Sequence, residues 1–130
     1  MPSVATRTVQ FKRIATLFVV DDVVKTAEYY RDVLGFELLS YFADPPVYAM
    51  VARGAAEMHF GKADGEVQKP NRATRKTSFD AYIWVDDIHG LYEEMLAAGA
   101  NITEGPVKRI YESTEVVIED RNGFIIVFAN

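Results

Sequence analysis

Two stretches of the chain decide its fold: VDDVVKTAEYYRDVLGF at residues 20–36 and VDDIHGLYEEMLAAGA at residues 85–100. The two VDD motifs lie half a chain length apart in a sequence of 130 residues. A repeat at that spacing predicts two copies of one structural unit. Aspartate before an apolar helical stripe is a typical N-cap residue, so Asp21 or Asp22 in the first motif, and Asp86 or Asp87 in the second, are interpreted as helix caps and not as catalytic groups.

The apolar periodicity around each repeat predicts the same order of elements twice. In the first half it predicts a strand over 14–20, a helix closed by Gly35, and strands near 37–43, 47–52 and 56–61. In the second half it predicts a strand over 81–85, a helix closed by Gly99, and strands near 101–104, 114–119 and 124–129, with a break at Gly105-Pro106. The expected structure is one α+β domain over residues 1–130, built from two tandem βαβββ modules at about 12–61 and 79–130, with a linker at about 62–78.

Composition narrows the classes of partner. The chain contains no cysteine, and its start, MPSVATRTVQFKR, shows no apolar leader, so a cytoplasmic location is expected. No apolar run reaches the roughly 18 residues of a membrane span, so no membrane partner is expected. A net charge of −5 argues against nucleic-acid binding. The basic stretch KPNRATRK is interpreted as a solvated part of the linker.

The motif in the first half is specific enough to suggest a family. The chain resembles the vicinal oxygen chelate superfamily (glyoxalases, bleomycin-resistance proteins and extradiol dioxygenases) through Val20, Asp22, Tyr30, Leu34, Gly35 and Phe36. The C-terminal EDRNGFIIVF is similar to the closing turn and last strand of that family. The aromatic residue at Trp84 makes the bleomycin-resistance branch the nearest match.

This resemblance implies an architecture and a place for the site. Each sheet should curl with its helix on the convex face, and the two sheets together should form a half-open barrel around a ligand cavity. A second subunit often completes that cavity, so a homodimer is expected. In metal-dependent members four positions hold the ion, and by the motif they correspond to Ala15, Glu57, Asp80 and Val127 here. Alanine and valine cannot ligate a metal, so no metal cofactor is expected.

Strand alternation predicts which side chains face the cavity. They are Glu57 and His59 in the first module, Asp80, Tyr82 and Trp84 in the second, and Tyr111 from a neighbouring loop. A mostly apolar and aromatic wall with a few polar groups is typical of a small-molecule site. The two carboxylates would favour a cationic ligand, and the rings would stack on a planar one. The alternative for Tyr82 and Trp84 is that they fill the barrel or a dimer interface.

Three functions are compatible with these residues. The first is a metal-free dimer that binds an aromatic or cationic small molecule, such as a drug. The second is a metal-dependent lyase, isomerase or dioxygenase using Glu57, His59 and Asp80, or a metal-free enzyme with Glu57 as general base and His59 as acid. The third is a structural or regulatory partner without a small ligand. The missing metal ligands favour the first.

Overall fold

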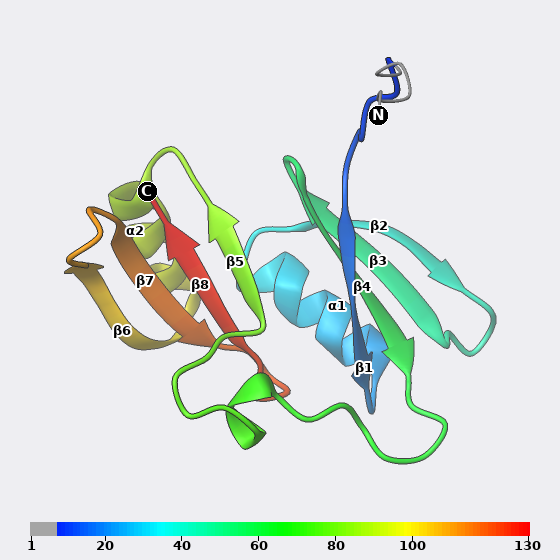
Figure 1. Cartoon of the computed structure of the whole chain (residues 1–130). Coiled ribbons are helices and arrows are strands. Elements are labelled where there is room, and N and C mark those ends of the chain that lie inside the picture. Colours follow the sequence, from blue (N-terminus) through cyan, green and yellow to red (C-terminus); the bar gives the residue numbers. More distant parts are fainter. Residues whose placement is uncertain (1–7) are drawn as a thin grey trace, which may run out of the picture.

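The computed structural model describes residues 8–130 and contains two four-stranded mixed sheets, each with one helix packed on one face (Figure 1). The strand orders are β1-β4-β3-β2 and β5-β8-β7-β6, so the second sheet repeats the topology of the first. The prediction of two tandem βαβββ modules is confirmed. The absence of a leader was expected partly from residues 1–7, which lie outside the described range.

The first module contains β1 (Ala15–Val20), α1 (Val23–Asp32), β2 (Glu37–Phe42), β3 (Tyr48–Arg53) and β4 (Ala56–Lys62). The second contains β5 (Ala81–Trp84), α2 (Ile88–Ala98), β6 (Asn101–Lys108), β7 (Thr114–Glu119) and β8 (Ile125–Ala129). The connecting segment carries one short 3-10 helix, Asn71–Ala73. In each module the first strand pairs in parallel with the last, and the other two pairings are antiparallel. The equal pairing pattern places equivalent strands at equivalent positions in the two halves.

Both VDD motifs act as helix caps, as predicted. An oxygen of Asp22 accepts the Lys25 amide at 2.9 Å, and an oxygen of Asp87 accepts the Gly90 amide at 2.9 Å. These bonds satisfy amides that no helical carbonyl can reach. At the other end, Gly99 closes α2 in the left-handed conformation at φ 83°, as expected.

The first helix ends differently from the expectation. Its C-cap is Val33 in the right-handed conformation, with its amide bonded to the Tyr29 carbonyl. Gly35 does adopt a positive φ of 74°, but it turns the chain two residues after the cap. The predicted left-handed glycine is therefore present, and its role is to redirect the chain into β2.

The expected strand break at Gly105-Pro106 is wrong. β6 continues from Asn101 to Lys108, and the irregular pairing with β7 between Glu104 and Val107 absorbs the two residues. The backbone approaches closely here, because a Cβ on Gly105 would lie 2.2 Å from the carbonyl oxygen of Glu115. Only glycine fits this bulge. The Gly105-Pro106 pair, which the sequence suggests as the end of a strand, therefore marks an irregularity inside the strand.

One core joins the two modules. The rings of Phe18 and Phe124 stack with centroids 4.2 Å apart, and the hydroxyl of buried Tyr30 donates to an Asp120 oxygen at 2.7 Å. Burial raises the pKa of the Asp120 carboxyl despite that hydrogen bond. Strand alternation also predicts the core faces of the strands, and most of these residues are buried: Phe18, Val20, Met58, Phe60, Ala81, Phe124, Ile126 and Phe128. Thr16, Ile83 and Val85, predicted on the same faces, are only partly buried.

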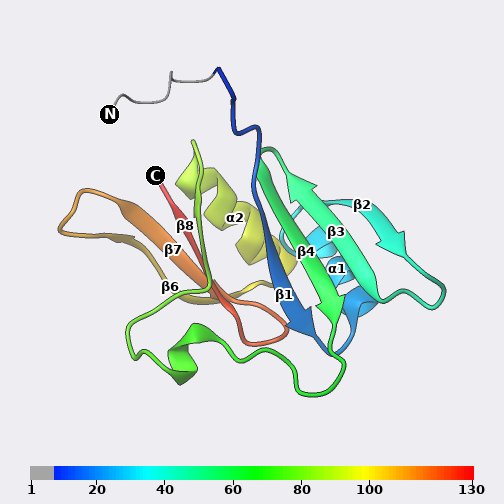
Figure 2. The same ribbon diagram turned by 45° about the vertical axis from the view of Figure 1, so that its right-hand side comes forward.

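The two sheets remain separate, and they do not close into a barrel. β1 and β5 are edge strands that face one another across a gap, without a ladder between them (Figures 1 and 2). Residues 8–14, before β1, project away from both sheets (Figure 2). Neither helix in residues 8–130 has the length and apolarity that a bilayer crossing demands. The facing edges β1 and β5 border a cleft between the two modules.

Candidate functional site

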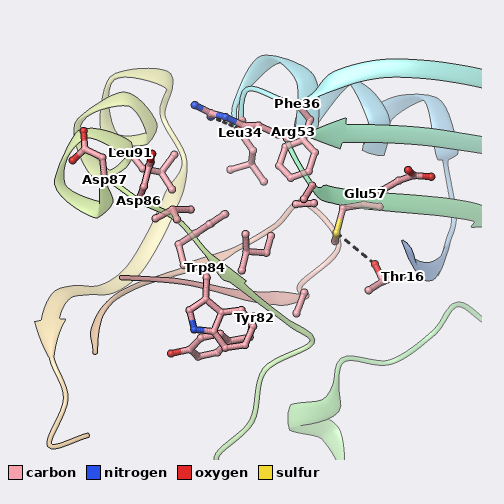
Figure 3. Close-up of a pocket in the computed structure, with 18 of the residues that line it drawn as sticks. Thr16, Leu34, Phe36, Arg53, Glu57, Tyr82, Trp84, Asp86, Asp87 and Leu91 are labelled. Atoms are coloured by element: carbon pink, nitrogen blue, oxygen red, sulfur yellow. Dashed lines mark hydrogen bonds between the residues drawn. The ribbon is translucent and has the colours of Figure 1, made fainter. Parts of the chain in front are cut away.

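A cleft of about 930 Å³ lies between the two modules, and both contribute to its walls (Figure 3). Its apolar lining includes Leu34 and Phe36 from the first module and Leu91 from α2. Arg53 and Glu94 form a two-pronged ion pair at its edge, with Nη2 and Oε1 at 3.0 Å. Such a cleft can accept an apolar group, and its charged groups lie at the rim.

Tyr82 and Trp84 stand together on the edge strand β5 and lie side by side at the border of this cleft (Figure 3). Their ring centroids are 4.8 Å apart, and Phe79 from the linker adds a third ring 5.3 Å from Tyr82. Trp84 is 76% exposed, which is unusual for the largest apolar side chain. The period of the strand directs both side chains to the same face, as the sequence predicts.

A second cavity, of about 540 Å³, lies on the other side of Tyr82, between the linker and the face of the second sheet opposite to its helix. Its centre is Glu115 on β7, which is only 3% exposed. One of its oxygens accepts the hydroxyls of Tyr82 at 2.5 Å and Tyr111 at 2.7 Å. The other accepts Nε of Arg109 at 2.8 Å. Arg109 also binds both oxygens of Glu104, at 2.8 and 2.9 Å.

This network settles the protonation of its members. Burial alone would raise the pKa of Glu115, but the hydrogen bonds from Tyr82, Arg109 and Tyr111 outweigh it and leave that pKa below its usual value. Burial and the bond to Glu115 raise the pKa of Tyr82, and the bond to Glu115 raises that of Tyr111. Hydrogen bonding to Glu104 and Glu115 raises the pKa of Arg109. The cavity therefore contains an ionised carboxylate held by two protonated phenols.

Sequence reasoning missed Glu115, Arg109 and Glu104. One signal for Glu115 is visible in the strand TEVVIE, where Val116 and Ile118 alternate with it and are fully buried. That alternation places Glu115 on the cavity face of β7. Arg109 carries no such signal, because it lies after the end of β6 and only the hairpin geometry brings it to Glu115.

The first module places a smaller polar chain on its equivalent face. The hydroxyl of Tyr48 lies 2.7 Å from Nδ1 of His59, and Nε2 of that ring lies 2.6 Å from a Glu57 oxygen. Nε of Arg13 lies 3.4 Å from the other Glu57 oxygen, but its side chain is 74% exposed. The structure therefore brings the predicted pair Glu57 and His59 together, and adds Tyr48 to them.

Asp80 is held apart from that pair by backbone bonds. One of its oxygens accepts the Asn71 amide and the other accepts the Ile125 amide, both at 2.8 Å. The carboxylate thereby ties the linker to the start of β5 and β8. Within the part of the chain that the structure describes, no three His, Cys, Asp or Glu side chains converge where they could share a metal ion. The other expected site residue of this module, Tyr111, lies in the β6–β7 hairpin and is 60% exposed.

A comparison with known proteins identifies the family. The model of the Glyoxalase/Bleomycin resistance protein/Dioxygenase superfamily matches residues 10–128. The chain belongs to this superfamily. A lactoylglutathione lyase of Haemophilus influenzae is 32% identical to it over 126 residues, which cover 87% of each chain.

Solved structures with similar coordinates support the fold. TioX from Micromonospora has a TM-score of 0.75 at 19% identity, covering 92% of this chain and 98% of the other. A bleomycin-binding protein in complex with bleomycin has a TM-score of 0.72 at 17% identity, with the same coverage of both chains. At these identities the likeness concerns the fold alone.

The residues at the superfamily's metal positions do not fit a metal ion in this chain. Ala15 and Val127 offer no ligand atom, and both oxygens of Asp80 are occupied by backbone amides. Glu57 is the remaining position with a carboxylate that accepts no backbone amide, and it is bonded to His59. A divalent transition metal needs three or four protein ligands, so one carboxylate with one imidazole is too few.

Proposed function

We propose that this superfamily member is a metal-free binding protein for an aromatic or cationic small molecule, such as a drug, and that it acts as a cytoplasmic homodimer. The observation that carries the proposal is Trp84, which is 76% exposed beside Tyr82 and borders the cleft between the modules. Exposed aromatic faces next to an apolar hollow offer stacking energy to a planar ligand. The bleomycin complex of a protein with this fold supports a ligand of drug size.

The dimer is proposed from the apolar surface around the free edges. Ile14 and Leu17, on or next to the edge strand β1, are 77% and 51% exposed, and Phe11 before them is 98% exposed. Trp84 occupies the facing edge of the other sheet. Contiguous apolar side chains of this size at unpaired strand edges favour association with a second copy. A second subunit would cover the part of a bound ligand that the cleft of one subunit leaves exposed to solvent.

The test uses Trp84 as the reporter, because the chain contains one tryptophan. A panel of planar aromatic and cationic compounds, each titrated into the protein, should quench or shift its fluorescence to saturation at micromolar concentrations for at least one member. Trp84→Phe removes the signal, and calorimetry with that variant then reports whether affinity drops as well. A panel without a saturating ligand by either method contradicts the proposal.

A metal-dependent lyase is the second candidate, because the lactoylglutathione lyase of H. influenzae is 32% identical to the chain. Glu57 occupies the one family ligand position that still has a suitable side chain free of backbone bonds, and His59 adjoins it. Metal content after equilibration with Zn, Ni, Mn and Fe and dialysis separates the two candidates. About one ion per chain, lost on Glu57→Gln or His59→Ala, would favour the enzyme. No retained ion supports the binding protein.

A further inference from the structure

We propose that the cavity around Glu115 is the subsite for a protonated amine attached to an aromatic ligand, with the amine donating to the phenol oxygens of Tyr82 and Tyr111. This rests on the proposed binding function and names the polar group that the ligand carries. The cavity is separate from the cleft between the modules, and Tyr82 forms part of the wall of both.

The first step is the direction of the tyrosine protons. A phenol has one donor hydrogen, and both Tyr82 and Tyr111 give theirs to the same oxygen of Glu115, at 2.5 and 2.7 Å. The raised pKa of both phenols keeps them protonated at neutral pH. The Tyr111 oxygen therefore presents lone pairs to a ligand, and so does the Tyr82 oxygen, which also lies 3.3 Å from Oγ of Ser113. These lone pairs bind hydrogen-bond donors and offer no donor to a carboxylate.

The second step is the charge of the cavity. Arg109 lies between Glu104 and Glu115, and its guanidinium is bonded to both carboxylates. These three groups together carry one net negative charge. The cations at the cavity mouth, Arg75 and Lys76, are exposed on the linker, where water and salt screen them. Arg75 is moreover turned back onto the carbonyl of Thr77. Glu104 is exposed as well, so the buried part of the site, Glu115 with Arg109, has no net charge and leaves the phenol oxygens to select the ligand.

The third step is an unpaired polar atom at the same place. The hydroxyl of Ser78 is buried without a hydrogen-bond partner, and Ser78 lines this cavity. A buried hydroxyl without a partner is costly, so a ligand atom that bonds to it has a ready site. Phe79 and Tyr82 add aromatic faces 5.3 Å apart on which the ring next to a cationic amine can pack.

Matched probes test the inference on the full-length wild-type protein. We would measure 1-naphthylmethylamine, 1-naphthoic acid and neutral 1-naphthylmethanol by calorimetry at pH 7.5 and 150 mM salt. The amine should bind about 10-fold more tightly than the acid or the alcohol, because an ammonium can donate to both phenol oxygens, the alcohol has one donor hydrogen and the ionised acid has none. Tyr82→Phe and Tyr111→Phe should each reduce this preference to about 3-fold or less, by removal of one acceptor oxygen. Tyr92→Phe, on α2 and outside both cavities, is the matched control and should keep it.

The outcomes separate this inference from the proposed function. An acid or alcohol that binds as tightly as the amine would overturn the amine subsite, and tighter binding of the acid would show that Arg75 and Lys76 dominate. The binding function would stand in both cases. An amine preference that survives both tyrosine substitutions would also overturn the assignment of these two oxygens. Failure of all three probes to bind would count against both proposals.

Discussion

The two modules share one topology, yet they carry different chemistry on their cavity faces. In the first, Tyr48, His59 and Glu57 form a linear chain, and the Glu57 side chain is 10% exposed. In the second, Glu115 collects three donors, and its side chain is 4% exposed. The carboxylate comes from β4 in the first module and from β7 in the second. A repeated backbone therefore does not repeat a site, because each cavity face is set by residues that the core does not constrain.

The two carboxylates, Glu115 and Glu57, also differ in how many protein donors bind them. Glu115 accepts three protein donors, so its removal takes the acceptor from the phenols of Tyr82 and Tyr111 and one of two carboxylate partners from Arg109. Glu57 has one imidazole partner and one exposed arginine, so water can replace what it offers. The second module thus holds its carboxylate with more protein donors than the first, and Asp80 bonds the linker next to it through the Asn71 amide.

The largest expected effect compares the two carboxylates directly. Glu115→Ala should lower the free energy of unfolding by about 3 kcal/mol, because two phenols and Nε of Arg109 lose a buried acceptor, while the guanidinium keeps Glu104 alone. Glu57→Ala should cost about 1 kcal/mol, because its partners reach water. Urea unfolding of both variants measures the difference. Equal losses would show that the two networks are equally buried in solution, contrary to the structure.

The next effect compares the equivalent positions on the first strand of each module, Asp80 and Ala15. Asp80→Ala should cost about 2 kcal/mol, because two backbone amides lose their acceptor. Ala15→Ser changes an exposed side chain and should stay within about 0.5 kcal/mol of wild type. Thermal and urea unfolding report both values. If Asp80→Ala leaves the free energy of unfolding unchanged but alters ligand binding, the carboxylate binds the ligand and does not stabilise the linker.

A smaller effect appears in the pH dependence of stability. The pKa of Glu115 is lowered in the folded protein, so its stabilising contribution is complete above its ordinary value of 4.5 and is lost as the pH falls through the folded value. The stability gap between wild type and Glu115→Gln should therefore narrow as the pH falls below 4.5. Urea unfolding at several pH values between about 3 and 7 measures this gap. Tyr111→Phe, which removes one donor, should show an intermediate narrowing, and a constant gap would contradict the network.

The smallest effect concerns the tautomer of His59 and changes no stability. When its ring is neutral, Nε2 should carry the hydrogen and donate to Glu57, while Nδ1 accepts from Tyr48. Long-range nitrogen–proton NMR resolves this easily, because the chain has two histidines and His89 is exposed. Glu57→Leu should raise the population of the Nδ1–H tautomer. A hydrogen on Nδ1 in the wild type would mean that His59 donates to Tyr48, and would contradict this assignment of donors and acceptors.

Much of the fold follows from local patterns in the sequence. The caps at Asp22 and Asp87 and the left-handed closure at Gly99 depend on backbone amides a few residues away, so short motifs are enough to predict them. The pairing of Glu57 with His59 is also local, since residues two apart on a strand share a face. The error at Gly105-Pro106 arose because a bulge and a break use the same residues, and only the neighbouring strand shows which one is present.

The amino-acid sequence by itself determined the two βαβββ modules, their helix caps and most core-facing positions of the strands, and through the family resemblance it predicted that Ala15 and Val127 stand at two metal positions. Each of these depends on residue type or on short periodicity, which the linear sequence contains in full. The tertiary structure alone decided that Asp80 binds backbone amides and that Arg109, Tyr82 and Tyr111 converge on Glu115. These contacts join a linker, a hairpin and two strands that are not neighbours in their sheet, so they depend on strand register and chain crossing. Periodicity assigns a side chain to a face, and only the packed fold assigns it a partner.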